Sequence, residues 1–278
     1  MRWFRLTLCL FALVVCTAES RAQNLVEEAK LWLGKAAHSE GRYRSMVFVY
    51  EPVAATTYMP AVLILPGGSY TYLAINSEGR DVAKWFASRG YVAVVVRYRM
   101  GFFGARYPQQ IEDYRKAMDY VKDNAVRLGI DTSRIGVVGF SAGGHLAGCA
   151  AIESSKRYRP AFAAMIYPVV TMRKPNCHHA SKKHLLRGDL SMEGELSLEE
   201  RVCDDFPPVF LLCCEDDRIV SPEGSHQLAS EFEKKGVNCK VEFHQRGGHG
   251  FGVRASSRSG AFNWQERFVE WLENTVFE

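Results

Sequence analysis

The feature that most constrains this chain is a Gly-x-Ser-x-Gly pentapeptide that lies between a strand pattern and a helix pattern. Residues 135–140 form an apolar run with β-branched side chains, and residues 142–147 are rich in small helix-compatible side chains. Gly139 and Gly143 have no Cβ atoms, so a strand and a helix can meet there in a sharp turn with Ser141 at its apex. An ordinary glycine-rich turn has the same composition, so the rest of the chain must decide between the two interpretations.

Strand and helix patterns alternate along most of the chain. This alternation predicts an α/β fold in which a mostly parallel central sheet carries helices on both faces. In such sheets, functional sites form at the carboxyl ends of the strands. Besides 135–140, strand patterns occupy residues 45–50, 61–65, 91–97, 161–167, 208–214 and 237–245, and helical spacing occupies residues 78–89, 108–128, 223–235 and 264–276.

Length and composition favour one large domain. The chain has 278 residues, of which 47% are hydrophobic, and this is enough to bury a substantial core. We expect a single domain over residues 23–278, with a polar insertion at 171–206 that lies over one end of the sheet. The net charge of +4 comes from scattered residues, so nucleic acid is not an expected partner.

The N-terminal segment resembles an export signal. Residues 1–22 combine early arginines with an apolar run at 6–18, which is too short to span a bilayer comfortably. Small residues before Gln23 predict cleavage there, and a cut directly after the apolar run is the alternative. Cys16 raises the further alternative of lipidation, although the valine before it is larger than that signal prefers. We therefore predict an exported protein, periplasmic or secreted, with no membrane span.

Two later strand ends carry the polar residues that a nucleophilic serine requires. A serine hydroxyl needs a base to accept its proton, and that base needs an acid to orient it. Three consecutive acids follow the strand pattern at 208–214, and His249 follows the pattern at 237–245 among four glycines. The order serine, acid, histidine is that of an α/β-hydrolase. We predict that Ser141 is the nucleophile, His249 the base and Asp217 the orienting acid.

A tetrahedral oxyanion would need N–H donors beside Ser141. The N–H of Ala142, directly after the nucleophile, is one candidate. A Pro-Gly-Gly-Ser loop follows the strand pattern at 61–65, and we expect Gly68 and Ser69 to supply the other N–H groups. The alternative interpretation of this loop is a plain turn.

The remaining histidines and cysteines carry weaker signals. His145 lies one helical turn after Ser141, so we expect it to pack or to hydrogen-bond locally. An exported protein could pair some of the six cysteines beyond the signal segment, but their positions predict no specific disulfide. Four residues of the insertion are of types that can bind a metal ion: Cys177, His178, His179 and His184. Their spacing matches no familiar zinc pattern, so we expect a solvated segment there, with a metal site as the alternative.

Four motifs together resemble a known family, the α/β-hydrolase esterases of the acetylxylan esterase and feruloyl esterase-like group. The motifs lie at residues 65–70, 139–147, 216–220 and 247–252, and the resemblance extends over about residues 45–276. It implies the α/β-hydrolase fold, no metal, no organic cofactor, and Asp217 rather than Asp216 as the acid. It also implies substrates that are acetyl or other short acyl esters of sugars.

The leading hypothesis is therefore an exported serine esterase that removes short acyl groups from plant-polysaccharide fragments through an acyl-enzyme intermediate. The expected partner is a small-molecule or oligosaccharide ester, and the sequence leaves the oligomeric state open. Three alternatives remain. They are a peptidase of the prolyl oligopeptidase type, a carboxylesterase with a non-carbohydrate substrate, and a non-catalytic relative.

Overall fold

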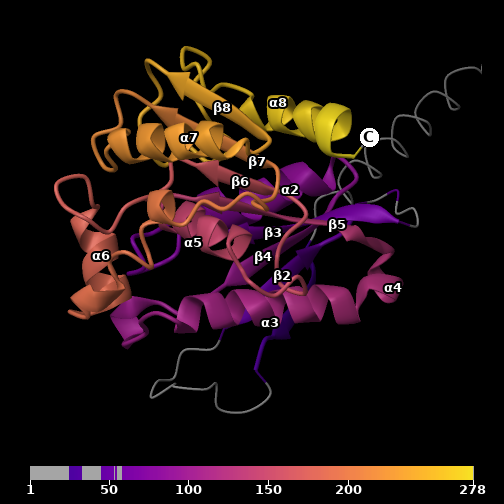
Figure 1. The fold of residues 1–278 in the computed structure, drawn as a ribbon. Helices are drawn as coiled ribbons and strands as arrows, with labels where there is room; N and C mark the ends of the chain where they lie inside the picture. The colour runs from indigo at the N-terminus through magenta and orange to yellow at the C-terminus, as the bar shows by residue number, and fades with distance from the viewer. Residues whose placement is uncertain (1–24, 33–44, 53, 55–57, 278) are drawn as a thin grey trace, which may run out of the picture.

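The computed structural model describes residues 25–32, 45–52, 54 and 58–277, which are built around an eight-stranded sheet (Figure 1). The strand order is β1-β2-β4-β3-β5-β6-β7-β8. The pairs β1–β2 and β2–β4 are antiparallel, and every later pair is parallel. This arrangement confirms the predicted α/β fold with a mostly parallel sheet.

The strands are β1 (Leu25–Lys30), β2 (Met46–Tyr50), β3 (Met59–Leu65), β4 (Val92–Arg97), β5 (Ile130–Phe140), β6 (Ala163–Ile166), β7 (Val209–Cys214) and β8 (Cys239–His244). The α-helices are α2 (Asp81–Ala87), α3 (Gln109–Asp123), α4 (Ala125–Leu128), α5 (Ala142–Ala151), α6 (His179–Leu186), α7 (Glu223–Lys235) and α8 (Trp264–Trp271). Short helical turns are η1 (Ile75–Arg80), η2 (Gly101–Phe103), η3 (Leu190–Met192), η4 (Leu198–Glu200) and η5 (Leu272–Val276).

The central strands are mostly apolar because helices cover both faces of the sheet, although residues 131–134 near the start of β5 are polar and partly exposed. Successive residues of a strand point to opposite faces, so Leu63 lies in one core cluster and Ile64 in the other. Helices α3, α5 and α7 pack on the first face, and α2 and α8 pack on the second (Figure 1).

Two expectations from the sequence were incomplete. The edge strand β1 was not predicted, because its alternating partly exposed residues include three charged side chains and give little apolar signal. The single helix expected at 108–128 was wrong, since α3 ends at Asp123 and α4 begins at Ala125. Asn124 interrupts the helix with its side-chain amide donating to the Tyr120 carbonyl at 2.8 Å.

The insertion at 171–206 is anchored to the core on its inner side. It contains α6 and two short turns, and four of its leucines are buried in the first core cluster. Its outer side is polar, as the composition indicated. These leucines are Leu185, Leu186, Leu196 and Leu198.

The sequence signals at 1–22 lie outside the described residues. In the described part of the chain, no helix has the length and apolar character needed to cross a bilayer.

The turn between β5 and α5 has the tight geometry that its glycines predict. Ser141 has φ 53° and ψ −118°, a strained combination for a residue with a side chain. A Cβ atom at Gly139 would lie 2.1 Å from the Gly143 carbonyl oxygen, and one at Gly143 would lie 2.0 Å from the Leu65 carbonyl oxygen. Both contacts are with backbone, so no side-chain movement can relieve them.

We expect Gly143→Ala to lower the free energy of unfolding by about 3 kcal/mol, because α5 must move away from the end of β3. Gly236→Ala is the matched control, since Gly236 has φ +65° but its added Cβ would meet no atom within 4 Å. Its cost should be only about 1 kcal/mol of left-handed backbone strain. Urea unfolding measures both values, and equal losses would contradict the steric account of Gly143.

Candidate active site

Three side chains from separate strand ends form one hydrogen-bonded row. The Ser141 Oγ lies 2.9 Å from His249 Nε2, and His249 Nδ1 lies 2.6 Å from Asp217 Oδ2. Ser141 follows β5, Asp217 follows β7 and His249 follows β8, so the parallel strands deliver all three to the same edge of the sheet. The structure thus brings together the three residues that the sequence singled out.

The partners of His249 determine its tautomer. The Asp217 carboxylate can only accept a hydrogen bond, so Nδ1 of His249 carries the proton and donates it. Nε2 is then unprotonated and accepts from the Ser141 hydroxyl. This is the arrangement in which an imidazole can remove a proton from serine.

The two aspartates of the loop after β7, Asp216 and Asp217, form different contacts. Asp217 Oδ1 accepts the N–H groups of Ile219 at 2.8 Å and Val220 at 3.0 Å, which leaves Oδ2 for His249. Asp216 Oδ1 accepts the N–H groups of Gly247 at 2.9 Å and of the next glycine, Gly248, at 2.8 Å. Asp216 therefore holds the backbone of the loop that carries His249, a role that sequence reasoning did not predict.

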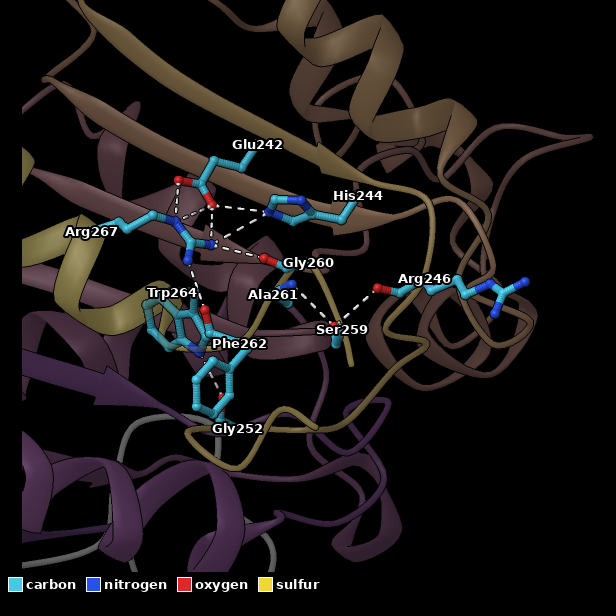
Figure 2. Close-up of polar contacts among 10 residues, drawn as sticks. All are labelled: Glu242, His244, Arg246, Gly252, Ser259, Gly260, Ala261, Phe262, Trp264 and Arg267. Atoms are coloured by element: carbon cyan, nitrogen blue, oxygen red, sulfur yellow. Dashed lines mark hydrogen bonds and ion pairs between the residues drawn. The ribbon is translucent and has the colours of Figure 1, made fainter. Parts of the chain in front are cut away.

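The segment that follows His249 is fixed by residues around the start of α8 (Figure 2). Trp264 Nε1 donates to the Gly252 carbonyl at 2.8 Å. Arg267 binds Glu242 of β8, with 2.7 Å between Nη2 and Oε2, and also donates to the carbonyl of Phe262 at 2.7 Å (Figure 2). The histidine loop is therefore tied at its far end to both the last strand and the last long helix.

The loop that carries two of the predicted donor groups passes close to Ser141. A Cβ atom at Gly67 would be only 2.9 Å from the Ser141 Cβ, so the loop after β3 passes close to the serine. The Gly67 N–H is already used, because it donates to Glu78 Oε2 at 2.8 Å. The N–H groups of Gly68, Ser69 and Ala142 donate to no atom within residues 58–277. They are thus available to a ligand oxygen.

His145 connects three parts of the site. It is fully buried on α5, and its Nε2 lies 2.7 Å from the Leu196 carbonyl of the insertion. Because a carbonyl only accepts, Nε2 carries the proton, and Nδ1 accepts the Tyr70 hydroxyl at 2.7 Å. Burial lowers the pKa of His145 to about 4. His145 does form hydrogen bonds, but these two partners are not local, since they lie 75 and 51 residues away in the sequence.

The histidines of the insertion have structural contacts. His178 caps the start of α6, where its Nδ1 lies 2.9 Å from the Ser181 hydroxyl. Burial is the main cause that lowers the pKa of His178, and the nearby charge of His249 adds to it. Within the described ranges, no group of three or more His, Cys, Asp or Glu side chains is arranged to hold a metal ion. The six cysteines described are free thiols.

Sequence reasoning missed two buried polar residues behind the catalytic row, Glu78 and Tyr167. Glu78 lies on η1 and accepts the Tyr167 hydroxyl at 2.9 Å. A signal for Glu78 existed, because it lies four and eight residues before Val82 and Phe86, in line with their apolar stripe. An acid in such a stripe indicates a buried carboxyl group that must find hydrogen-bond donors. Tyr167 carried no comparable signal.

Comparison with known proteins gives consistent results. Residues 47–172 match the family described as BD-FAE. An acetylxylan esterase from Xylanibacter ruminicola is 30% identical over 198 residues, which cover 69% of this chain and 41% of that protein. Endo-1,4-beta-xylanase B from Butyrivibrio fibrisolvens is 30% identical over 208 residues, covering 69% of this chain and 32% of that protein. The chain thus spans less than half the length of either relative.

Solved structures show the same fold. An acetyl ester-xyloside bifunctional hydrolase from Caldicellulosiruptor lactoaceticus has a TM-score of 0.82 and 28% identity, covering 90% of this chain and 97% of that one. A thermophilic esterase from Thermogutta terrifontis, with propionate bound, has a TM-score of 0.73 and 22% identity, covering 90% of this chain and 94% of that one. At that identity, the second likeness concerns the fold alone.

The buried His145 predicts a defined acid sensitivity. Its pKa is about 4 in the folded chain and an ordinary 6.5 in the unfolded chain, so the unfolded state binds more protons between these values. His145 should therefore lower the free energy of unfolding by about 3 kcal/mol as pH falls from about 6.5 to 4, with no effect above pH 7.

Urea unfolding at a series of pH values tests this linkage. His145→Gln should flatten the loss of stability below about pH 6.5, because glutamine does not titrate. His179→Gln, which replaces an exposed histidine of the insertion, is the control and should leave the pH dependence as in the wild type. An unchanged slope in His145→Gln would contradict the linkage.

Proposed function

We propose that this chain, which is an α/β-hydrolase of the acetylxylan esterase and feruloyl esterase-like group, is a serine esterase that removes short acyl groups from carbohydrate esters. The observation that carries the proposal is the row from Ser141 through His249 to Asp217, which has hydrogen-bond distances of 2.9 and 2.6 Å. Acetyl esters of xylan are the proposed substrate class.

In the acylation step, Ser141 Oγ attacks the carbonyl carbon of the ester while His249 Nε2 takes the hydroxyl proton. The carbonyl oxygen becomes an oxyanion, and the proposed donors to it are the N–H groups of Gly68, Ser69 and Ala142, which have no other acceptor in the described part of the chain. His249 then returns the proton to the leaving sugar hydroxyl as the carbon–oxygen bond breaks. Ser141 is left as an acyl ester.

In the deacylation step, a water molecule takes the place of the sugar. His249 accepts a proton from the water, whose oxygen attacks the acyl carbon, and the proton then passes to Ser141 as the acid leaves. Asp217 remains ionised throughout and stabilises the imidazolium that forms in each step. Its two backbone donors, Ile219 and Val220, keep its carboxylate in the orientation that this task requires.

The substrate class is supported by the names of the relatives. An acetylxylan esterase and an acetyl ester-xyloside hydrolase are among them, and both names specify an acetyl ester or a xylose-based compound. His178 of the insertion at 171–206 lies near the catalytic histidine, because the charge of His249 adds to the burial that lowers the pKa of His178. We propose that this insertion forms part of the leaving-group pocket.

Export is part of the proposal. Residues 1–22 have the order of charges and apolar residues of a secretory signal, and polysaccharide fragments are met outside the cytoplasm. Those residues lie outside the described part of the chain, so the support comes from the sequence alone.

The wild type should release acetate from acetylated xylo-oligosaccharides, and Ser141→Ala should lose at least about 10⁴-fold of this activity. A fluorophosphonate probe should label the wild type and not Ser141→Ala. Acetate release and mass spectrometry measure the two results. Hydrolysis of p-nitrophenyl acetate but of no acetylated sugar would indicate a general carboxylesterase. Faster cleavage of peptidyl substrates would indicate a peptidase. Absence of labelling in the wild type would indicate a non-catalytic relative.

The two neighbouring aspartates give a matched pair of variants. Asp217→Asn should lower kcat by roughly 10³–10⁴-fold, because the amide no longer fixes the tautomer of His249 or stabilises its charged form. Asp216→Asn keeps an oxygen that can accept from Gly247 and Gly248, so its loss should stay below about 10-fold. Steady-state kinetics on p-nitrophenyl acetate compare them, and a larger loss in Asp216→Asn would reverse the assignment.

A further inference from the structure

Glu78 is a buried acid with both carboxylate oxygens engaged. It lies on η1 with a relative exposure of 4%. Oε2 accepts the Gly67 N–H at 2.8 Å, and Oε1 accepts the Tyr167 hydroxyl at 2.9 Å. Burial raises the pKa of Glu78, and the two donors oppose that effect. Within the described residues Glu78 forms no ion pair, so these donors are what compensates for its burial.

Tyr167 continues the chain of contacts to the histidine loop. Its hydroxyl oxygen accepts the Gly252 N–H at 3.0 Å while its proton is donated to Glu78. Its ring lies against the imidazole of His249, with 4.6 Å between ring centroids. Tyr167 directly follows β6 and has φ +38°, a conformation that costs free energy in a residue with a side chain. The fold maintains that strain next to the general base.

The backbone on both sides of this chain of contacts is packed without space for a side chain. A Cβ at Gly67 would lie 2.7 Å from Glu78 Oε2 and 2.9 Å from the Ser141 Cβ. A Cβ at Gly252 would lie 2.4 Å from the Ser77 carbonyl oxygen. The loop after β3 and the loop after β8 therefore both approach the short segment that carries Glu78.

From these contacts we propose that Glu78 and Tyr167 are positioning residues. Together they bind the loop that carries the N–H groups of Gly68 and Ser69 to the loop that carries His249, so that the oxyanion donors and the base keep one mutual geometry. Neither residue forms a hydrogen bond with Ser141, His249 or Asp217 in the described part of the chain; each acts through the backbone that it holds, and the Tyr167 ring also packs against the His249 imidazole. This inference rests on the proposed serine-esterase chemistry.

Glu78 and Tyr167 thus form a bridge between the two loops, and this bridge has a specific catalytic consequence. Displacing a reacting group by about 1 Å can cost about 10²-fold in rate, and an oxyanion donor is worth about 10²–10³-fold. Loss of the bridge should therefore slow attack by Ser141 more than it weakens binding of the ester. A residue that only fills the core would change stability without such a selective loss of rate.

The test measures the second-order rate at which a small fluorophosphonate labels Ser141, together with kcat and KM on p-nitrophenyl acetate. Tyr167→Phe removes one hydroxyl and no volume, and it should slow labelling and kcat by about 10- to 100-fold with KM changed less than about 3-fold. Glu78→Ala should cause a similar loss. Glu78→Gln should recover part of it, because its amide can still accept from Gly67 and donate to the Tyr167 oxygen.

The double variant Glu78→Gln with Tyr167→Phe distinguishes a single bridge from two separate effects. If the residues act as one unit, the labelling rate of the double variant should lie within about 2-fold of the rate of the slower single variant. Losses that multiply would overturn the bridge. If Glu78→Ala fails to fold, Tyr167→Phe and Glu78→Gln still decide the question.

Two control variants remove equivalent groups elsewhere. Tyr114 is a buried tyrosine whose hydroxyl donates to the Tyr158 carbonyl at 2.7 Å, and Glu153 is a buried acid paired with Arg115 at the far end of α5. Tyr114→Phe and Glu153→Gln should label at the wild-type rate. Labelling of Tyr167→Phe within 2-fold of the wild type would overturn the inference, whereas absence of labelling in the wild type would overturn the esterase proposal instead.

Discussion

The close approach of α5 to the end of β3 is the constraint on which the rest of the site depends. Gly143 lies so near the Leu65 carbonyl that even a Cβ atom would be 2.0 Å from its oxygen. This contact places the first turn of the helix beside the loop that follows β3. Ser141, with its strained φ of 53°, then lies where that loop meets the first turn of α5, the two segments that carry the N–H groups we propose as oxyanion donors.

The features that the sequence predicted well are those set by local sterics or by strand order. The glycines around Ser141 can be interpreted within one pentapeptide, and the parallel sheet brings later strand ends to the same edge. Asp217 and His249 follow from that topology, because each lies in the loop after a parallel strand, β7 and β8. The choice of Asp217 over Asp216 depended on family resemblance, since adjacent acids in a loop differ only in where the backbone points them.

What the sequence could not predict depends on contacts between distant segments. Strand β1 has too few apolar residues to be recognised alone and is defined by its pairing with β2. The break at Asn124 needs one side-chain bond to a preceding carbonyl, which no periodicity of apolar residues reveals. The link between Glu78 and Tyr167 joins positions 89 residues apart, and their meeting is known only once the sheet is folded.

Two side chains support the site by binding backbone groups of other segments. Asp216 holds the histidine loop through backbone N–H groups, whereas His145 joins α5 to the insertion through the Leu196 carbonyl. A backbone carbonyl is present whichever side chain its residue carries, so the outer residues of the insertion can be substituted while this hydrogen bond remains. The outer surface of the insertion can therefore change while the fold keeps the row of Ser141, His249 and Asp217, which needs fixed side chains at every position.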